Sequence, residues 1–156
     1  MGNLQSNPRI TPFLWFDSNA EEAADFYVSI FKNSRRIREM RNPGEAPGPK
    51  GSVLVLDFEL DGQRFTALNG GPMFKFTEAV SFVVRCDSQE DLDYYWDKLS
   101  AGGKESQCGW LKDKFGLSWQ IVPAQMSELV SHPKAMKAMM GMTKLIIADL
   151  ERAAQS

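Results

Sequence analysis

Histidine and cysteine are scarce in this chain, and long apolar runs are missing from it. The 156 residues include one histidine, His132, and two cysteines, Cys86 and Cys108. Two cysteines make neither the framework of a disulfide-rich domain nor the ligand pattern of a structural zinc site. We therefore expect both cysteines to be free thiols in a reducing compartment.

The sequence also lacks the usual signals for membranes, secretion and nucleic acids. No apolar run approaches the roughly 18 residues of a membrane-spanning helix, and Met1 to Pro8 contain neither the basic nor the apolar region of a secretory signal. A formal net charge of -2 with interspersed signs provides no extended basic field. We expect a cytoplasmic protein with no membrane or nucleic-acid partner. The basic run Lys32 to Arg41 is typical of an edge strand whose charges discourage aggregation.

What is present is the pattern of one compact domain, which we expect to span residues 1–156. Apolar residues at 10–16 predict a strand. Cap residues followed by helical spacing predict a helix from Ala20 that buries Phe26, Ile30 and Phe31. Three further strands are expected at 35–41, 52–60 and 64–68, the last two joined by the turn Asp61-Gly62.

The same order of elements then starts again. A strand is expected at 80–86, and a helix capped by Asp87-Ser88 follows it. Three short strands are expected after that helix, at 105–108, 110–112 and 117–122. We predict an α+β fold of two βαβββ modules, at residues 10–69 and 79–123.

A helical C-terminal extension is predicted at residues 124–156. Its apolar positions recur at helical spacing and form a stripe rich in methionine: Met136, Met139, Met140, Leu145, Ile146 and Leu150. Methionine fills irregular gaps without demanding a specific partner. We expect the stripe to cover the sheet or to dock onto a second chain.

Three motifs show a resemblance to a known family: residues 11–17 with 20–23 and 26–27, residues 67–72, and residues 108–116 with 119–123. Together they resemble the PhnB-like group, commonly labelled 3-demethylubiquinone-9 3-methyltransferase, of the glyoxalase/bleomycin resistance/dioxygenase superfamily. That superfamily is also called vicinal oxygen chelate. The resemblance implies paired βαβββ modules in a pseudo-twofold arrangement around a cleft, in a homodimer.

The resemblance also allows the expected metal ligands to be checked. Metal-dependent members place a histidine near the first strand of a module and a carboxylate near the end of its last strand. No histidine lies in residues 10–17 or 79–87, and the carboxylate positions correspond to Thr66 and Gln120. His132 lies beyond the second module, beside Pro133 at a helix start. We therefore expect no metal and no other cofactor. No Gly-x-Gly-x-x-Gly motif follows a strand, so the residues do not support the methyltransferase label.

A small-molecule site is expected in the cleft that the resemblance implies. The aromatic candidates are equally compatible with a place in the core. The candidate ligand-binding residues combine aromatic walls with orienting polar groups: Trp15, Thr66, Asn69, Trp110, Trp119 and Gln120. Cys108 and Asp113 are weak catalytic candidates. Cys108 lies near Lys112 but has no histidine as a base, and Asp113 is typical of a turn.

Two functional hypotheses follow from these residues. The first is a metal-free protein that binds a small aromatic or hydrophobic molecule. The alternative is an enzyme of the lyase, dioxygenase or transferase type that acts on such a molecule, with a weakly held divalent metal or none. In both hypotheses the partners are a small-molecule ligand and a second copy of the chain.

Overall fold

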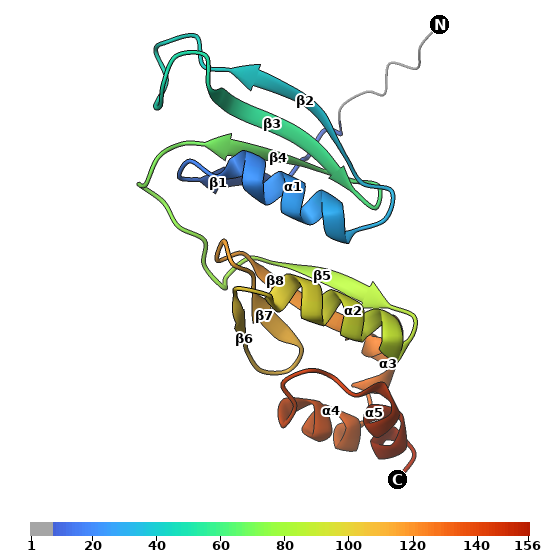
Figure 1. The fold of residues 1–156 in the computed structure, drawn as a ribbon. Helices are drawn as coiled ribbons and strands as arrows, with labels where there is room; N and C mark the ends of the chain where they lie inside the picture. Colours follow the sequence, from blue (N-terminus) through green and yellow to red (C-terminus); the bar gives the residue numbers. More distant parts are fainter. Residues whose placement is uncertain (1–7) are drawn as a thin grey trace, which may run out of the picture. The chain divides into compact units, whose positions relative to one another are not determined.

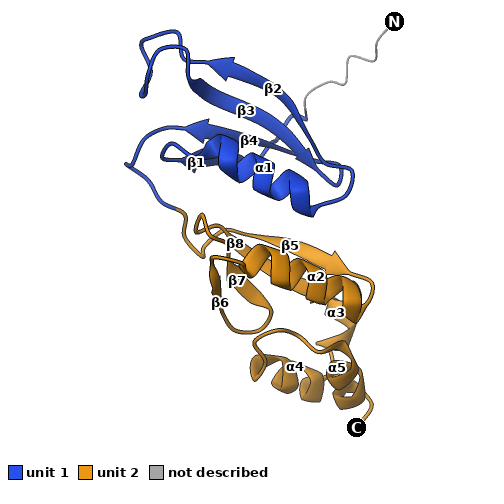
Figure 2. Ribbon diagram, viewed as in Figure 1, with its two compact units in different colours: residues 1–75 blue, residues 76–156 orange. Residues whose placement is uncertain are grey.

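A computed structural model describes residues 8–156, and the chain divides into two compact units, Met1–Lys75 and Phe76–Ser156 (Figure 2). The expectation about a secretory signal concerns residues 1–7, which lie outside the described residues. No helix within residues 8–156 has the length and apolar character needed to cross a membrane.

The first unit is one four-stranded sheet with one helix (Figure 1). Its elements are β1 (Phe13–Phe16), α1 (Ala20–Ile30), β2 (Arg35–Arg41), β3 (Val53–Leu60) and β4 (Gln63–Asn69). The strand order is β1-β4-β3-β2, with β1 parallel to β4 and the other pairs antiparallel. The predicted strand-helix-strand-strand-strand order is therefore confirmed.

Alternation along the strands places the core of this unit between the sheet and α1. Leu14 and Phe16 are buried while their neighbours Phe13 and Trp15 are not, because successive strand residues face opposite sides. On α1 the buried aromatic residue is Tyr27, which stacks on Phe58.

The prediction that α1 buries Phe26 and Phe31 was wrong, because both are only half-buried. The buried face of α1 consists of Ala20, Ala23, Ala24, Tyr27 and Ile30. These positions follow the helical spacing of three and four residues, which turns Phe26 away from the sheet.

β2 is the edge strand that the basic run predicts, and its arginines pair with carboxylates. Arg35 pairs with Glu59 at 3.1 Å and Arg38 pairs with Asp57 at 2.9 Å. Both carboxylates belong to β3, so the pairs lie on the sheet face opposite α1. These ion pairs place charged side chains along the edge of the first sheet, which discourages another strand from pairing with it.

The second unit repeats this topology. Its elements are β5 (Ser81–Cys86), α2 (Gln89–Ser100), β6 (Lys104–Glu105), β7 (Trp110–Lys112) and β8 (Ser118–Pro123). The order β5-β8-β7-β6 matches that of the first sheet, with β5 parallel to β8. The predicted strand at 105–108 is much shorter than expected, because Cys108 and Gly109 have φ values of 60° and 85°, which end a strand.

Three C-terminal helices complete the second unit: α3 (Met126–Leu129), α4 (Pro133–Met140) and α5 (Ile147–Ala154). The segment between α4 and α5 is tied to the sheet, since the Cys108 N–H donates to Met142 O and the Gly109 N–H to Thr143 O. Leu145 and Leu150 are fully buried. Met136 and Met140, in contrast, are 38% and 64% exposed, so this part of the predicted stripe does not cover the sheet.

Candidate functional site

The β7–β8 hairpin positions the strongest candidate residues. Its turn is closed by hydrogen bonds from the Gly116 N–H to Asp113 O and from the Asp113 N–H to Leu117 O, and Gly116 supplies the positive φ of 89° that the turn requires. The hairpin register pairs Trp110 with Gln120. The two side chains therefore lie side by side on one face of the sheet.

Asp113 holds this turn together from inside. Its carboxylate is 2% exposed and accepts hydrogen bonds from the Phe115 N–H, the Leu117 N–H and the Trp119 indole N–H at 2.8, 3.1 and 2.9 Å. A carboxylate with these donors is a structural anchor, not an accessible base. The three donors are two backbone groups and a tryptophan. Lys112, the neighbour of Asp113 in sequence, pairs with Glu78, and its hydrogen bond lowers the pKa of the Glu78 carboxyl.

Strand alternation divides the residues of β8 between two environments. Trp119 and Ile121 are buried in the core with α2, and Trp119 is only 3% exposed. Gln120 lies on the opposite face, where the register places it between Val83 and Trp110. The structure thus brings Trp110 and Gln120 together and places Trp119 in the scaffold behind them.

A cavity of about 310 Å³ lies on this face of the second sheet. It is lined by residues of β5, β8, the hairpin and the C-terminal helices: Val83, Arg85, Cys108, Trp110, Gln120, Val122, Ala124, Met126, Ser127 and Met139. Two predicted ligand-binding residues and one catalytic candidate, Cys108, are among them. A mainly apolar lining with a few polar groups is the usual composition of a small-molecule site.

The C-terminal helices form one wall of this cavity. Met126 and Ser127 come from α3, and Met139 comes from α4. Met139 is thus the member of the methionine stripe that contributes to the cavity. Without these helices the cavity would keep only its sheet side.

The polar groups of the cavity are mostly hydrogen-bond donors. The Gln120 Nε2 donates to Ser81 Oγ at 2.9 Å, which fixes the amide and leaves its Oε1 as an acceptor. Within residues 8–156, the Arg85 guanidinium and the Trp110 indole N–H have no hydrogen-bond or ion-pair partner. No carboxylate lines the cavity.

The two cysteines differ in their surroundings. Cys86 is fully buried, and burial raises the pKa of its thiol to about 12, with further upward contributions from Asp91 and Asp87. Cys108 is half-buried, has a positive φ and lines the cavity. Of the two free thiols, Cys108 is the one that a ligand in the cavity would meet.

In the first unit, the predicted ligand-binding residues are held by internal contacts. The Trp15 indole N–H donates to Gly71 O at 2.9 Å, and its ring packs so closely on Gly70 that a Cβ there would lie 2.5 Å from a ring carbon. Thr66 Oγ1 donates to Asp57 Oδ1 at 2.8 Å. Trp15 and Thr66 therefore serve the fold of their own unit.

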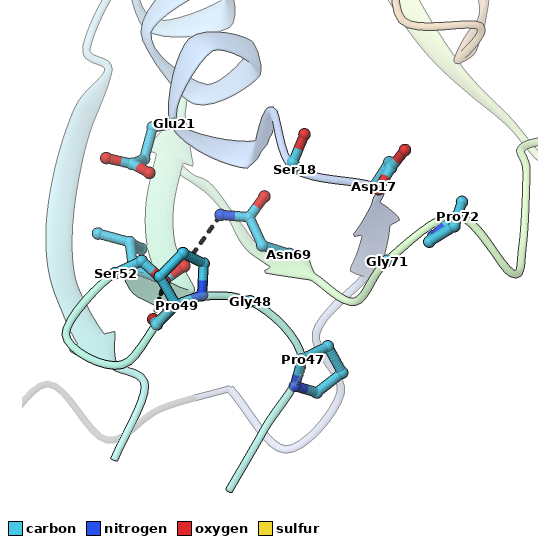
Figure 3. A pocket seen from close by; sticks show the side chains of 11 residues that line it. Asp17, Ser18, Glu21, Pro47, Gly48, Pro49, Ser52, Asn69, Gly71 and Pro72 are labelled. Carbon is cyan, nitrogen blue, oxygen red and sulfur yellow. Dashed lines mark hydrogen bonds between the residues drawn. The ribbon is translucent and has the colours of Figure 1, made fainter. Parts of the chain in front are cut away.

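Asn69 has a comparable structural role, although it also lines a cavity. Its Oδ1 accepts from the Ala20 N–H at 2.8 Å at the start of α1, and its Nδ2 donates to Val53 O at 3.0 Å. The cavity of about 360 Å³ beside it is shown in Figure 3, with Asp17, Ser18 and Glu21 labelled near the start of α1 and the Pro47–Pro49 loop across from them. The predicted cap residues at 17–19 make no side-chain cap, because the distant Asn69 supplies it.

The donor groups in the described residues do not fit a divalent metal. Thr66 is engaged with Asp57, whose other oxygen pairs with Arg38. Gln120 is a neutral amide between an aliphatic and an aromatic neighbour. Within residues 8–156 no three His, Cys, Asp or Glu side chains converge in a way that would hold a metal ion. A hard cation requires anionic oxygen ligands, which these positions lack.

Arg85 is the charged residue among the cavity residues that sequence reasoning missed. The signal was the alternation in β5, where Val83 and Arg85 share a face with Gln120 and Val122 through the strand register. A cation on a strand is ordinarily a solvated surface residue, so the sequence alone gave no reason to single it out.

Comparison with known proteins gives one family and several similar structures. The sequence model of the 3-demethylubiquinone-9 3-methyltransferase family matches residues 8–122. A PhnB protein from Bacillus cereus, described by the same activity, is 35% identical with a TM-score of 0.67, and the match covers 74% of this chain and 98% of that one. No curated protein matches. The family match ends before α3 and α4, so the helical wall of the cavity lies outside it.

Two more distant structures share the fold. Protein PA1353 from Pseudomonas aeruginosa is 20% identical with a TM-score of 0.60, over 75% of this chain and 97% of that one. A mutant of the fosfomycin resistance protein FosX from Listeria monocytogenes, solved with manganese(II) and a dihydroxypropylphosphonic acid, is 16% identical with a TM-score of 0.53. The match covers 73% of this chain and 89% of that one. At these identities the likeness concerns the fold alone.

Proposed function

Because the chain belongs to the 3-demethylubiquinone-9 3-methyltransferase family, also called PhnB-like, and has the glyoxalase or vicinal oxygen chelate fold, we propose that it is a metal-free binding protein for small aromatic or hydrophobic molecules. The observation that supports the proposal is the cavity on the second sheet. There Trp110 and Gln120 lie side by side, and the helices α3 and α4 supply Met126 and Met139.

The cavity is suited to recognise a planar apolar group. Trp110 offers a flat aromatic surface, and the methionines adapt their shape to what they contact. The fixed Gln120 amide provides one oriented acceptor, so a ligand that donates a hydrogen bond is favoured over a purely hydrocarbon one.

An enzyme acting in the same cavity is the second candidate, favoured by the thiol of Cys108 in its lining. Against it, the described residues that line the cavity include no histidine or carboxylate to serve as a general base. Methyl transfer is not part of the proposal. In both units the strand-to-helix turn, at residues 17–19 and 87–88, lacks the glycine-rich loop of a nucleotide-binding fold.

The proposal extends to the state of the protein in the cell. We propose a cytoplasmic homodimer in which both units belong to one domain of residues 1–156. The exposed Met136 and Met140 on α4 support a second copy as the partner.

The test is ligand binding to variants of the cavity. A panel of planar aromatic compounds, with neutral 2-naphthamide as the reference, is screened by the shift in Tm and followed by calorimetry. We expect Trp110→Ala to weaken binding by about tenfold or more, and Gln120→Ala to weaken compounds that donate a hydrogen bond.

The matched control is Tyr94→Ala, which removes an aromatic ring that is 40% exposed on α2 and does not line the cavity. It should leave every dissociation constant unchanged. If all active compounds bind the Trp110 and Gln120 variants as tightly as the wild type, the cavity is not the binding site. A stoichiometric divalent metal lost on Gln120→Ala would contradict the metal-free part of the proposal.

A further inference from the structure

Arg85 is a charged residue in the cavity that the fold itself does not use. The arginines of β2 are each engaged by a carboxylate: Arg35 by Glu59, Arg36 by Asp25 and Glu39, Arg38 by Asp57 and Arg41 by Glu39. For Arg85 no ion pair or side-chain hydrogen bond occurs within residues 8–156.

The rest of the lining does nothing to neutralise this cation. The other nine residues around the cavity include no Asp or Glu, and their polar groups are an amide, a hydroxyl, a thiol and an indole N–H. An arginine in such surroundings presents up to five N–H donors with a delocalised positive charge. The group that satisfies it best is a planar oxyanion, which accepts two parallel hydrogen bonds.

Geometry limits the size of the molecule that reaches both Arg85 and Trp110. Arg85 is on β5 and Trp110 is on β7, with β8 between them. Neighbouring strands lie about 4.8 Å apart, and Arg85 pairs with Val122 whereas Trp110 pairs with Gln120, two residues or about 7 Å along β8, so the two backbones are separated by roughly 12 Å. A carboxylate attached to one or two fused aromatic rings spans the space that their side chains leave.

We propose that the cavity takes a planar aromatic molecule with a single negative charge, whose oxyanion is held by Arg85 while its ring packs against Trp110. The inference rests on the proposed binding function and adds the chemical class of the ligand. One cation and no acid in the lining select an anion over a neutral compound or a cation. The exposure of Arg85 lets salt screen part of the attraction.

The experiment compares molecules of nearly equal shape and different charge. Dissociation constants of 2-naphthoate, 2-naphthalenesulfonate and neutral 2-naphthamide are measured by calorimetry with the full chain. For the wild type we expect the two anions to bind about tenfold tighter than the amide, the usual gain from a charged hydrogen-bond partner at a partly exposed site. Raising the salt concentration should weaken the anions and leave the amide unchanged.

Variants assign that preference to one residue. Arg85→Gln should remove the preference and keep the affinity for 2-naphthamide, whereas Arg85→Lys should restore part of it, because lysine keeps the charge without the planar fork. The control Arg152→Gln removes an equal charge from α5, outside the cavity, and should change no constant.

The outcomes separate this inference from the proposed function. If the amide binds in a manner that depends on Trp110 but the anions bind no tighter, the anion inference is wrong and the proposed function stands. If the anions keep their preference in Arg85→Gln, another group holds the oxyanion and the assignment is wrong. If none of the three compounds binds, and no other planar compound of the panel does, the proposed function itself is overturned.

Discussion

At the scale of single residues, neighbours in sequence have opposite roles in the candidate site. Trp119 and Gln120 are adjacent on β8, yet Trp119 is buried and donates a hydrogen bond to Asp113, whereas Gln120 lines the cavity. Asp113 was a weak catalytic candidate, and its burial with three donors gives it a structural role instead. The predictions at this scale concern Asp113 and the two cysteines.

Removing the Asp113 carboxylate should destabilise the hairpin severely. Asp113→Ala leaves two backbone N–H groups and the Trp119 indole without their acceptor, so we expect the free energy of unfolding to fall by about 3 kcal/mol or more. Urea denaturation provides the measurement. The control Asp97→Ala, at an exposed position of α2, should stay within about 0.5 kcal/mol of the wild type. A small effect of Asp113→Ala would mean that the turn forms without its anchor.

The two thiols should differ in reactivity. At pH 8 the Cys86 thiol stays protonated, because burial raises its pKa to about 12, and it has no access to solvent. We expect iodoacetamide to modify the native chain once, at Cys108, and twice in urea, as read by mass spectrometry. Cys108→Ser should abolish the native reaction, and a ligand in the cavity should slow it. Labelling of Cys86 in the native protein would contradict the burial on which this prediction depends.

At the scale of elements, one side chain of α2, Gln89, adds to the backbone hydrogen bonds that hold the C-terminal segment to the second module. Gln89 Nε2 donates to Leu145 O at 3.1 Å, and Gln89 Oε1 accepts from the Ile147 N–H at 2.8 Å. The same side chain donates to Asp93, whose carboxylate also pairs with Lys144. This cluster fixes the segment before α5 and, through α4, the helical wall of the cavity.

Gln89→Ala should therefore weaken the attachment of the C-terminal extension, residues 124–156, to α2. Two backbone groups of residues 145 and 147 lose their partner, and we expect the free energy of unfolding to fall by about 2 kcal/mol. Urea denaturation tests this, and hydrogen exchange should locate the loss in residues 142–154. The control Gln125→Ala removes only an exposed contact to Glu151 and should be close to neutral. Equal effects of the two substitutions would contradict the role given to Gln89.

Acid should weaken the same cluster. Hydrogen bonds from Gln89 and Lys144 lower the pKa of Asp93 in the folded chain below its ordinary value of 3.8. A carboxyl whose pKa is lower in the folded state contributes stability above its unfolded pKa and loses it as the pH falls through the folded pKa. The free energy of unfolding is measured from about pH 5 to about pH 2, a range that spans the ordinary pKa of an Asp carboxyl. It should fall less steeply with decreasing pH in Asp93→Asn than in the wild type. An identical slope in the variant would contradict the prediction.

At the scale of the whole molecule, each unit has its own sheet, helix and core, and the chain repeats one topology. The repeat does not extend to the roles of the residues. In the first unit the candidates Trp15, Thr66 and Asn69 hold their own scaffold, and Asn69 also lines a cavity, whereas in the second Trp110 and Gln120 line the cavity that we propose as the binding site. In the second unit part of the cavity wall comes from the C-terminal helices α3 and α4, which have no counterpart in the described part of the first unit.

The association of two chains is the prediction at this scale. Light scattering at about 50 µM, a concentration above ordinary dimer dissociation constants, should give twice the mass of one chain. Met140→Glu places a charge on the exposed face of α4, where Met140 is 64% exposed, and should shift the protein toward the monomer. The control Met73→Glu alters a residue that is 77% exposed outside that face and should not. A wild-type monomer at this concentration would refute the dimer.

The sequence by itself determined the elements and their repetition. Alternation and helical spacing are local properties, so the two strand-helix-strand-strand-strand orders and the Ser88 cap of α2 follow from neighbouring residues. The tertiary structure decided which side of each strand became core and which became cavity. That choice depends on contacts between distant residues: Asn69 capping α1, Asp113 holding Trp119, and α3 and α4 reaching Arg85 and Gln120. Alternation defines two faces of a strand, but only the packing of a distant helix determines which face remains open to a ligand.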